Sequence, residues 1–263
     1  MDYIEIPRLR LNRAIRHLNE FMQEEDKYLA TNPFATFTER YTDNGNECLR
    51  LVFKVHQEPP KALGVIAGDC IHNLRAILDN IAWSLGQAFP PTDPKAKSDR
   101  LSFPICDSKQ KYQERLQHPD WKTINSFPAA AQELIESLQP YHSTMYAHRI
   151  SVLNALWNAD KHRSPDLVGG ASSGIRQSYN FQQPSSLSAG LYIQDGKAFG
   201  YGTLPDGGVP QGAKVELLDV QLLFQENGPA SGFIVRGLLY ELIQIVNQEI
   251  INKFEPIFPA VEE

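Results

Sequence analysis

The segment from Lys61 to Ala88 constrains the fold of this chain more than any other. It lies between two proline pairs, Pro59-Pro60 and Pro90-Pro91, and proline interrupts helices and strands. Six apolar residues fall within one arc of about 120° when residues are placed at 100° intervals; they are Ile71, Leu74, Ile77, Leu78, Ile81 and Leu85. This spacing predicts a long helix over 61–88, whose apolar side needs other elements to cover it.

The rest of the chain contains shorter patterns, some with the spacing of a helix and some with the period-two alternation of a strand. Apolar residues at helical spacing predict a helix over 8–30, and period-two alternation around Asn44-Gly45 predicts a β-hairpin. We expect short helices near 108–117, 119–126 and 128–138, and longer ones over 145–162 and 233–254. Most of the 17 glycines lie between the last two helices, together with a hairpin signal at Asp195-Gly196 and a strand pattern over 215–224.

These patterns predict an α+β protein, mainly a helical bundle with a β-hairpin insertion (about 34–57) and a β-rich insertion (about 165–232). We expect one domain over 1–263, with a helical core of 1–33, 60–163 and 233–258 and β insertions of 34–58 and 164–232. The final helix should return to pack on the bundle, because its apolar stripe needs cover. Alternatively, this stripe forms the contact of a homodimer.

Composition argues against several classes of protein. The formal net charge is −6, whereas proteins that coat nucleic acid usually carry a basic excess. The cysteines, Cys48, Cys70 and Cys106, lack the spacing of a disulfide scaffold or a zinc ribbon. The sequence has no apolar leader and no apolar stretch of about 20 residues, so we expect a cytoplasmic protein without a membrane partner. Phosphate-binding loops and nucleophile motifs are absent, and no cofactor is predicted.

The polar side of the helix over 61–88 carries an unusual set of side chains. Asp69, His72, Arg75, Asp79 and Trp83 recur at intervals of three or four residues, which places them on one face. From residue 62 to residue 89 there is no Lys and no Glu, the residues that usually cover a solvated helix face. Because Asp, His and Arg make directed hydrogen bonds, we expect this face to be buried against another element or to line a cleft.

The helix over 145–162 carries charges that complement this face. Arg149 and Asp160 lie among apolar residues, and cations follow at the helix end, where the helix dipole favours them; these are Lys161, His162 and Arg163. Charges in apolar surroundings are costly unless they are paired. We therefore expect the two helices to be neighbours, with Arg75 paired to Asp160 and Asp79 paired to Arg149 or Arg163.

Two interpretations of this network are open. In the first, the ion pairs only fix the register of two helices, or they bind a ligand through Asp69, Asp79, Arg149, Asp160, Lys161, Arg163 and Trp83. In the second, Arg75, His162 and His72 are catalytic, because acid–base or phosphoryl chemistry needs an imidazole and a cation for developing negative charge. No metal is predicted, since a di-iron bundle needs a second carboxylate–imidazole pair. A single metal ion on Asp69, His72 and His162 is the alternative.

Four short motifs carry a resemblance to known proteins. HNLRAILDNIAW at 72–83, FPI at 103–105, QPY at 139–141 and NADKHR at 158–163 together resemble an uncharacterised group of bacterial helical proteins. The first motif is also similar to the HEPN superfamily, helical bundles that include metal-independent ribonucleases with an Arg followed a few residues later by a catalytic His. In this chain Asn80 stands where that His would be, so His72 or His162 would have to supply the imidazole.

The sequence thus leads to two functional hypotheses. The first is an intracellular binding or interaction protein built around the His/Arg/Asp network, with an unidentified ligand or protein partner. The second, which the resemblance implies, is a HEPN-like ribonuclease or a related phosphoryl-transfer enzyme that acts on RNA.

Overall fold

The long helix forms over the expected residues: α2 spans Lys61–Ala88 and ends before Pro90. α1 (Glu5–Ala30) lies antiparallel beside it, since the Ser84 hydroxyl donates to the carbonyl of Tyr3 and the Cys70 thiol to that of Ala14. The computed structural model describes residues 2–43, 46–161, 165, 167–171, 175–177, 190–194, 197–202, 215–217, 220–225 and 228–260.

Further helices follow the sequence patterns closely. α3 spans Lys109–Gln117 and α5 spans Met145–Asp160; each starts at a hydroxyl side chain, Ser108 or Thr144, that accepts a hydrogen bond from a first-turn amide. The other helical segments are η1 (Ser98–Arg100), η2 (Lys122–Ser126), α4 (Ala129–Ser137), η3 (Pro140–His142), α6 (Val235–Ile245), the π-helical η4 (Val246–Ile251), α7 (Asn252–Phe254) and η5 (Glu255–Ile257).

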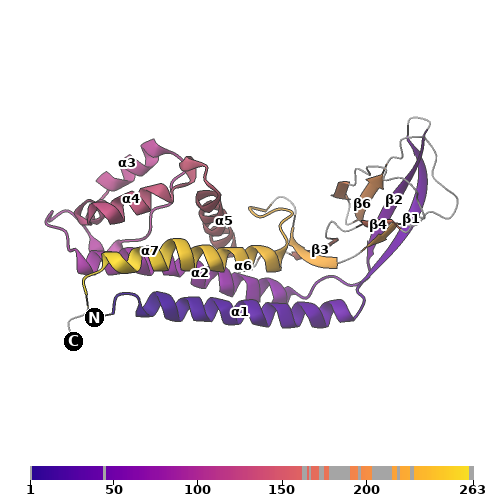
Figure 1. Cartoon of the computed structure of the whole chain (residues 1–263), viewed down its shortest axis with the longest axis horizontal. Coiled ribbons are helices and arrows are strands. Elements are labelled where there is room, and N and C mark those ends of the chain that lie inside the picture. The colour runs from indigo at the N-terminus through magenta and orange to yellow at the C-terminus, as the bar shows by residue number, and fades with distance from the viewer. Residues whose placement is uncertain are drawn as a thin grey trace.

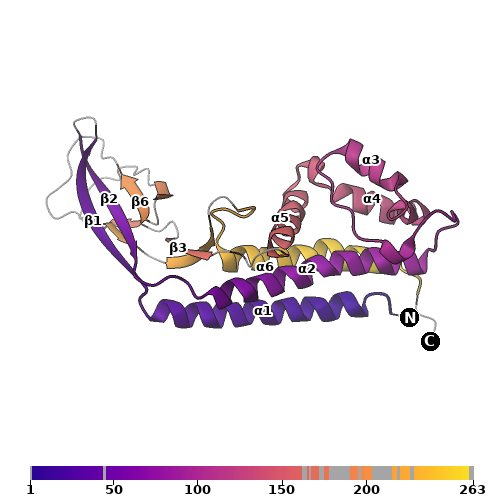
Figure 2. The ribbon, with the colours of Figure 1, turned by 180° about the vertical axis from the view of Figure 1, so that it is seen from behind.

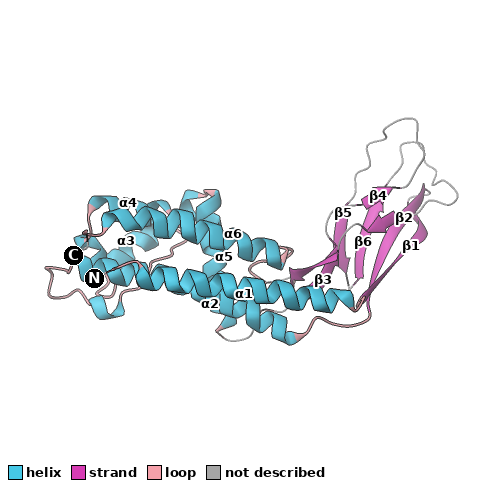
Figure 3. Ribbon diagram, turned by 60° about the horizontal axis from the view of Figure 1, so that its bottom comes forward, coloured by secondary structure: helices cyan, strands magenta, loops and turns pink. Residues whose placement is uncertain are grey.

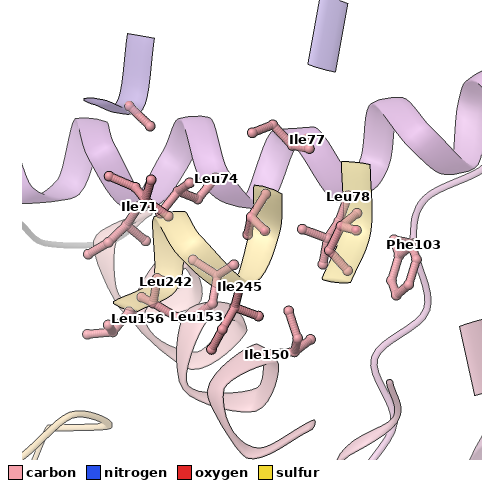
Figure 4. Packing of buried hydrophobic residues seen from close by; sticks show 14 of the residues in the cluster. Ile71, Leu74, Ile77, Leu78, Phe103, Ile150, Leu153, Leu156, Leu242 and Ile245 are labelled. Atoms are coloured by element: carbon pink, nitrogen blue, oxygen red, sulfur yellow. The ribbon is translucent and has the colours of Figure 1, made fainter. Parts of the chain in front are cut away.

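The helical core lies where α2 meets α5 and α6. Figure 4 shows Ile71, Leu74 and Leu78 of α2 with Leu153 and Leu156 of α5 and Leu242 of α6. The prediction that the final helix packs on the bundle is therefore confirmed. Its apolar residues are buried inside this core, and the homodimer alternative stays a prediction; they are Val235, Leu238, Leu239, Leu242, Ile243 and Ile245.

Both predicted β-hairpins form. β1 (Phe34–Asp43) pairs with β2 (Asn46–Val55), and β5 (Gly190–Gln194) pairs with β6 (Lys197–Gly202), each antiparallel; the turn residues themselves lie outside the described residues. The remaining strands are β3 (Leu167–Ala171), β4 (Ile175–Gln177), β7 (Val215–Leu217) and β8 (Val220–Phe224), which pair as β3–β8 and β4–β7.

The two β insertions join in a way that the sequence did not predict. β2 pairs with β6, so that both hairpins form one four-stranded sheet in the order β1-β2-β6-β5. Figure 1 shows this sheet at one end of an elongated molecule and the helices at the other, and Figure 2 shows the same division from behind. The mainly helical α+β class is confirmed. Among the described residues, no helix is both long and apolar enough to cross a membrane.

Candidate functional site

Arg75 lies at the centre of the predicted network and is held by contacts with three other parts of the chain. Its Nε donates to Asn154 Oδ1 of α5 at 3.2 Å, its Nη1 donates to Asp79 Oδ1 at 2.5 Å, and its Nη2 donates to the Phe103 carbonyl at 3.2 Å. The guanidinium carbon also lies 5.0 Å from the centre of the Trp157 ring. Only 5% of Arg75 is exposed, so no ligand could touch it without displacing one of these groups.

Asp79 extends the same cluster to the connector before α3. Its Oδ1 accepts a hydrogen bond from the Phe103 amide at 2.9 Å as well as the one from Arg75. Residue 103 therefore offers both its N–H and its C=O to the ion pair, and the Phe103 side chain is buried in the core. The Arg75–Asp79 pair and the Phe103 backbone form a clamp that fixes the connector on α2. We call these residues, with Asn154 and Trp157, the Arg75 clamp.

A second cluster lies two helical turns before the clamp, where the end of α5 meets α2. The Asp160 carboxylate packs directly on Gly68: a β-carbon added to Gly68 would come within 2.3 Å of Asp160 Oδ1. Burial raises the pKa of the Asp160 carboxyl, the nearby Asp69 charge raises it further, and His72 acts in the opposite direction. Asp69 and His72 themselves are exposed. The sequence prediction that α2 and α5 are neighbours is confirmed at both clusters.

The predicted ion pairs of Arg75 with Asp160 and of Asp79 with Arg149 are wrong, and the alternative partner of Asp79, Arg163, lies outside the described residues. Arg75 pairs with Asp79 on its own helix, one turn away, instead of with Asp160. Arg149 pairs with Glu241 of α6 at 2.8 Å and lies over the Phe233 ring, so it is not available to Asp79. The reason is that an i,i+4 partner on the same helix is within reach without any help from tertiary packing.

The remaining predicted site residues are dispersed. Trp83 lies near the far end of α2 and is 46% exposed, while the Lys161 ammonium lies 3.2 Å from the centre of the Trp157 ring. His162 and Arg163 lie outside the described residues. Within the residues that the structure describes, no group of three or more His, Cys, Asp and Glu side chains is arranged to hold a metal ion.

Sequence reasoning missed two partners of the clamp and one further network. Asn154 and Trp157 stand three residues apart on α5, a spacing that could have indicated a shared polar face.

Glu25 occupies a position of the buried stripe of α1 and is only 1% exposed. It accepts hydrogen bonds from Arg236 of α6 at 2.8 Å and from the Leu222 amide of β8 at 3.2 Å. An acidic residue within an apolar stripe was the available signal.

The two cysteines with described side chains are buried. Burial raises the pKa of the Cys70 thiol to about 12, as is typical of a core residue. Cys106 lies in a loop, but its side chain is only 3% exposed, because the Gln139 amide side chain accepts the hydrogen bond of its backbone N–H and holds the loop against the core. Neither thiol is therefore suited to act as a nucleophile.

Comparisons with known proteins add no relationship to this description: no protein-family model, curated protein or solved structure matches the chain.

Proposed function

We propose that the chain is a non-catalytic interaction protein that binds a protein partner through the outer face of α2. We define this outer face by four exposed residues of α2 that share one side of the helix: Val65, Asp69, His72 and Trp83. The observation that carries the proposal is the 46% exposure of Trp83, together with 49% for Val65, on a helix that has no Lys or Glu after its first residue. Figure 3 shows α1 and α2 side by side along the helical part.

Two exposed apolar residues of α1 lie near the same end of the helix pair as Trp83. The hydrogen bond from Ser84 to Tyr3 brings the end of α2 to the start of α1, where Ile6 and Leu9 are 51% and 56% exposed. Arg8 of the same helix pairs with Glu255 of the C-terminal segment at 2.7 Å.

The composition of the outer face is that of an interface. Protein interfaces are enriched in Trp and depleted in Lys and Glu, and most of the binding energy comes from a few large side chains surrounded by polar residues. Asp69 and His72 supply the polar part, and Asp69 would favour a partner that presents a basic side chain. Val65 extends the face by about 27 Å from Trp83 along α2, at 1.5 Å per residue.

The Arg75 clamp supports a non-catalytic function. A ribonuclease that used Arg75, His72 and His162 would need the Arg75 guanidinium to reach a phosphate oxygen in the transition state. Three of the five N–H groups of this guanidinium are already donated, and its exposed fraction is 5%. Its contacts are those of a structural ion pair.

The partner can be identified by photo-crosslinking in the producing cell. A photoreactive phenylalanine analogue at position 83 is compared with the same analogue at Tyr240, which is 59% exposed on α6. We expect a discrete protein adduct from position 83 only. In the complex reassembled from purified components, Trp83→Ala should weaken binding by about 30-fold, and Tyr240→Ala by less than about twofold. The proposal would be overturned by equal adducts from both positions, or by a complex whose affinity is unaffected by Trp83→Ala.

The clamp is tested separately on the purified chain. Arg75→Met should lower the free energy of unfolding by about 3 kcal/mol, because Asp79 loses its partner in a partly buried place. Partner binding by the folded fraction should stay unchanged, and the wild type should not cleave RNA. RNA cleavage that disappears in a folded Arg75→Met variant would favour the ribonuclease hypothesis instead.

A further inference from the structure

The outer face of α2 has a regular spacing that continues along most of the helix. Val65, Asp69, His72, Ala76 and Trp83 stand four, three, four and seven residues apart, and all of them are exposed or half-buried. At 100° per residue they fall within an arc of about 60°. A stripe in which spacings of three and four residues alternate is the pattern along which a second helix packs at a small crossing angle.

Hydrogen bonding also favours a helix on this face. The backbone groups in the middle of α2 are paired within the helix itself, so the stripe offers a partner only side chains. An extended segment would leave its own N–H and C=O groups without partners there, whereas a helix pairs them internally. Ala76 has a small side chain in the middle of the stripe, so a second helix can approach α2 closely.

The charge around Asp69 is negative. Asp69 is exposed, Asp160 of α5 lies half-buried near it, and neither carboxylate forms an ion pair with another residue that the structure describes. His72, one turn along α2, acts in the opposite direction on Asp160. Lys161 follows Asp160, but its ammonium lies over the Trp157 ring. A basic side chain of a partner would therefore meet complementary charge at Asp69 and Asp160.

We propose that the partner contacts α2 with an α-helix of about five turns, which lies along the stripe from Val65 to Trp83. This helix presents apolar residues to Val65 and Trp83, and it presents a lysine or an arginine to Asp69 and Asp160. The inference rests on the proposed function, to which it adds the shape and the charge of the element that binds.

The shape is tested by mapping where the photoreactive phenylalanine analogue attaches to the partner. The analogue replaces Val65, His72 or Trp83, and mass spectrometry identifies the partner residue in each adduct. Positions 65 and 83 lie about 27 Å apart along α2, so their adducts on a partner helix should lie about 18 residues apart in its sequence. The adduct of position 72 should fall between them in the same segment.

Other outcomes of the mapping separate the two proposals. An extended segment would place the adducts of positions 65 and 83 only about 8 residues apart, and a folded surface would place them in separate segments. Either result would overturn the helix while leaving the outer face of α2 as the binding surface. Absence of adducts from both positions would overturn the proposed function and the helix together.

The charge is tested in the complex reassembled from purified components. Asp69→Asn should weaken binding about three- to tenfold and Asp69→Lys more strongly. Exchange of the partner's basic residue nearest the position 72 adduct for Glu should restore binding to Asp69→Lys. Glu114→Gln removes an exposed carboxylate from α3 and should leave the affinity unchanged. Melting temperatures confirm that each variant is folded, and an affinity that Asp69→Lys leaves unchanged would overturn the basic contact.

Discussion

The charged residues of α2 and α5 differ in role because they differ in burial. Arg75 is enclosed by Asn154, Asp79 and the Phe103 carbonyl, and its charge is compensated where it stands. No described residue pairs with Asp160 in this way: its carboxylate faces Gly68 and lies near the like charge of Asp69, which the nearby His72 only opposes. It also stands at the C-terminal end of α5, where the helix dipole disfavours a negative charge.

Asp160→Asn should stabilise the protein at neutral pH. The pKa of this carboxyl is raised above its ordinary value of 3.8, so the folded state favours the protonated form. The protonated Asp160 carboxyl contributes fully to stability when the pH is below the ordinary pKa of 3.8. This contribution is lost as the pH rises through the raised pKa of the folded state. The gain from Asp160→Asn in melting temperature should therefore be present near pH 7 and disappear near about pH 3.

Asp107→Asn is the matched control for this pH series. A hydrogen bond from Lys111 lowers the pKa of the Asp107 carboxyl, so this group stabilises the fold at neutral pH and loses that effect as the pH falls. The two variants should shift the melting temperature in opposite directions near pH 7. A shift of Asp160→Asn that stays constant over the whole series would contradict the assignment.

At the scale of elements, the contact between α2 and α5 depends on a glycine. Gly68 is buried in the middle of α2, where alanine would normally be the better helix former. The three nearest atoms to a β-carbon at this position all belong to the Asp160 carboxylate, at 2.3, 2.9 and 3.2 Å. Gly68 is thus required by the neighbouring helix and not by its own.

The effect of Gly68→Ala on stability should change sign when the residue at position 160 is changed. In the wild-type background it should destabilise by about 1–2 kcal/mol, because the carboxylate must move out of its place. In an Asp160→Ala background the clash is gone, and the same change should stabilise by up to about 1 kcal/mol through helix propensity. Urea unfolding of the four proteins gives the coupling energy. Equal effects in both backgrounds would show that the two residues are not in contact.

At the scale of the whole molecule, Glu25 ties three distant parts of the sequence together. Its carboxylate on α1 accepts from Arg236 of α6 and from the Leu222 amide of β8, and Arg236 also pairs with Asp26 at 2.5 Å. β8 in turn pairs with β3. The network therefore attaches a strand pair to the helical bundle at the junction visible in Figure 1.

Glu25→Ala should loosen this junction. It leaves the Leu222 amide and part of the Arg236 guanidinium without a partner, at an expected cost of about 3 kcal/mol. Hydrogen exchange of the Leu222 amide should become faster than in the wild type. Glu24→Ala removes a carboxylate from the same turn, but its pair with Lys27 is exposed and should contribute no more than about 0.5 kcal/mol. Similar losses from both changes would contradict a special role for Glu25.

The sequence by itself determined the local elements. Proline pairs and helical spacing located α2 to the residue, and Asn-Gly and Asp-Gly pairs located two hairpins, because these signals act between neighbours in the chain. The polar stripe of α2 and the adjacency of α5 also followed from it. Only the tertiary structure decided which residues pair: Arg75 with Asp79 and Phe103, Arg149 with Glu241, and β2 with β6. Such choices depend on which segments meet in space, and burial then decides which charges stay open to a partner.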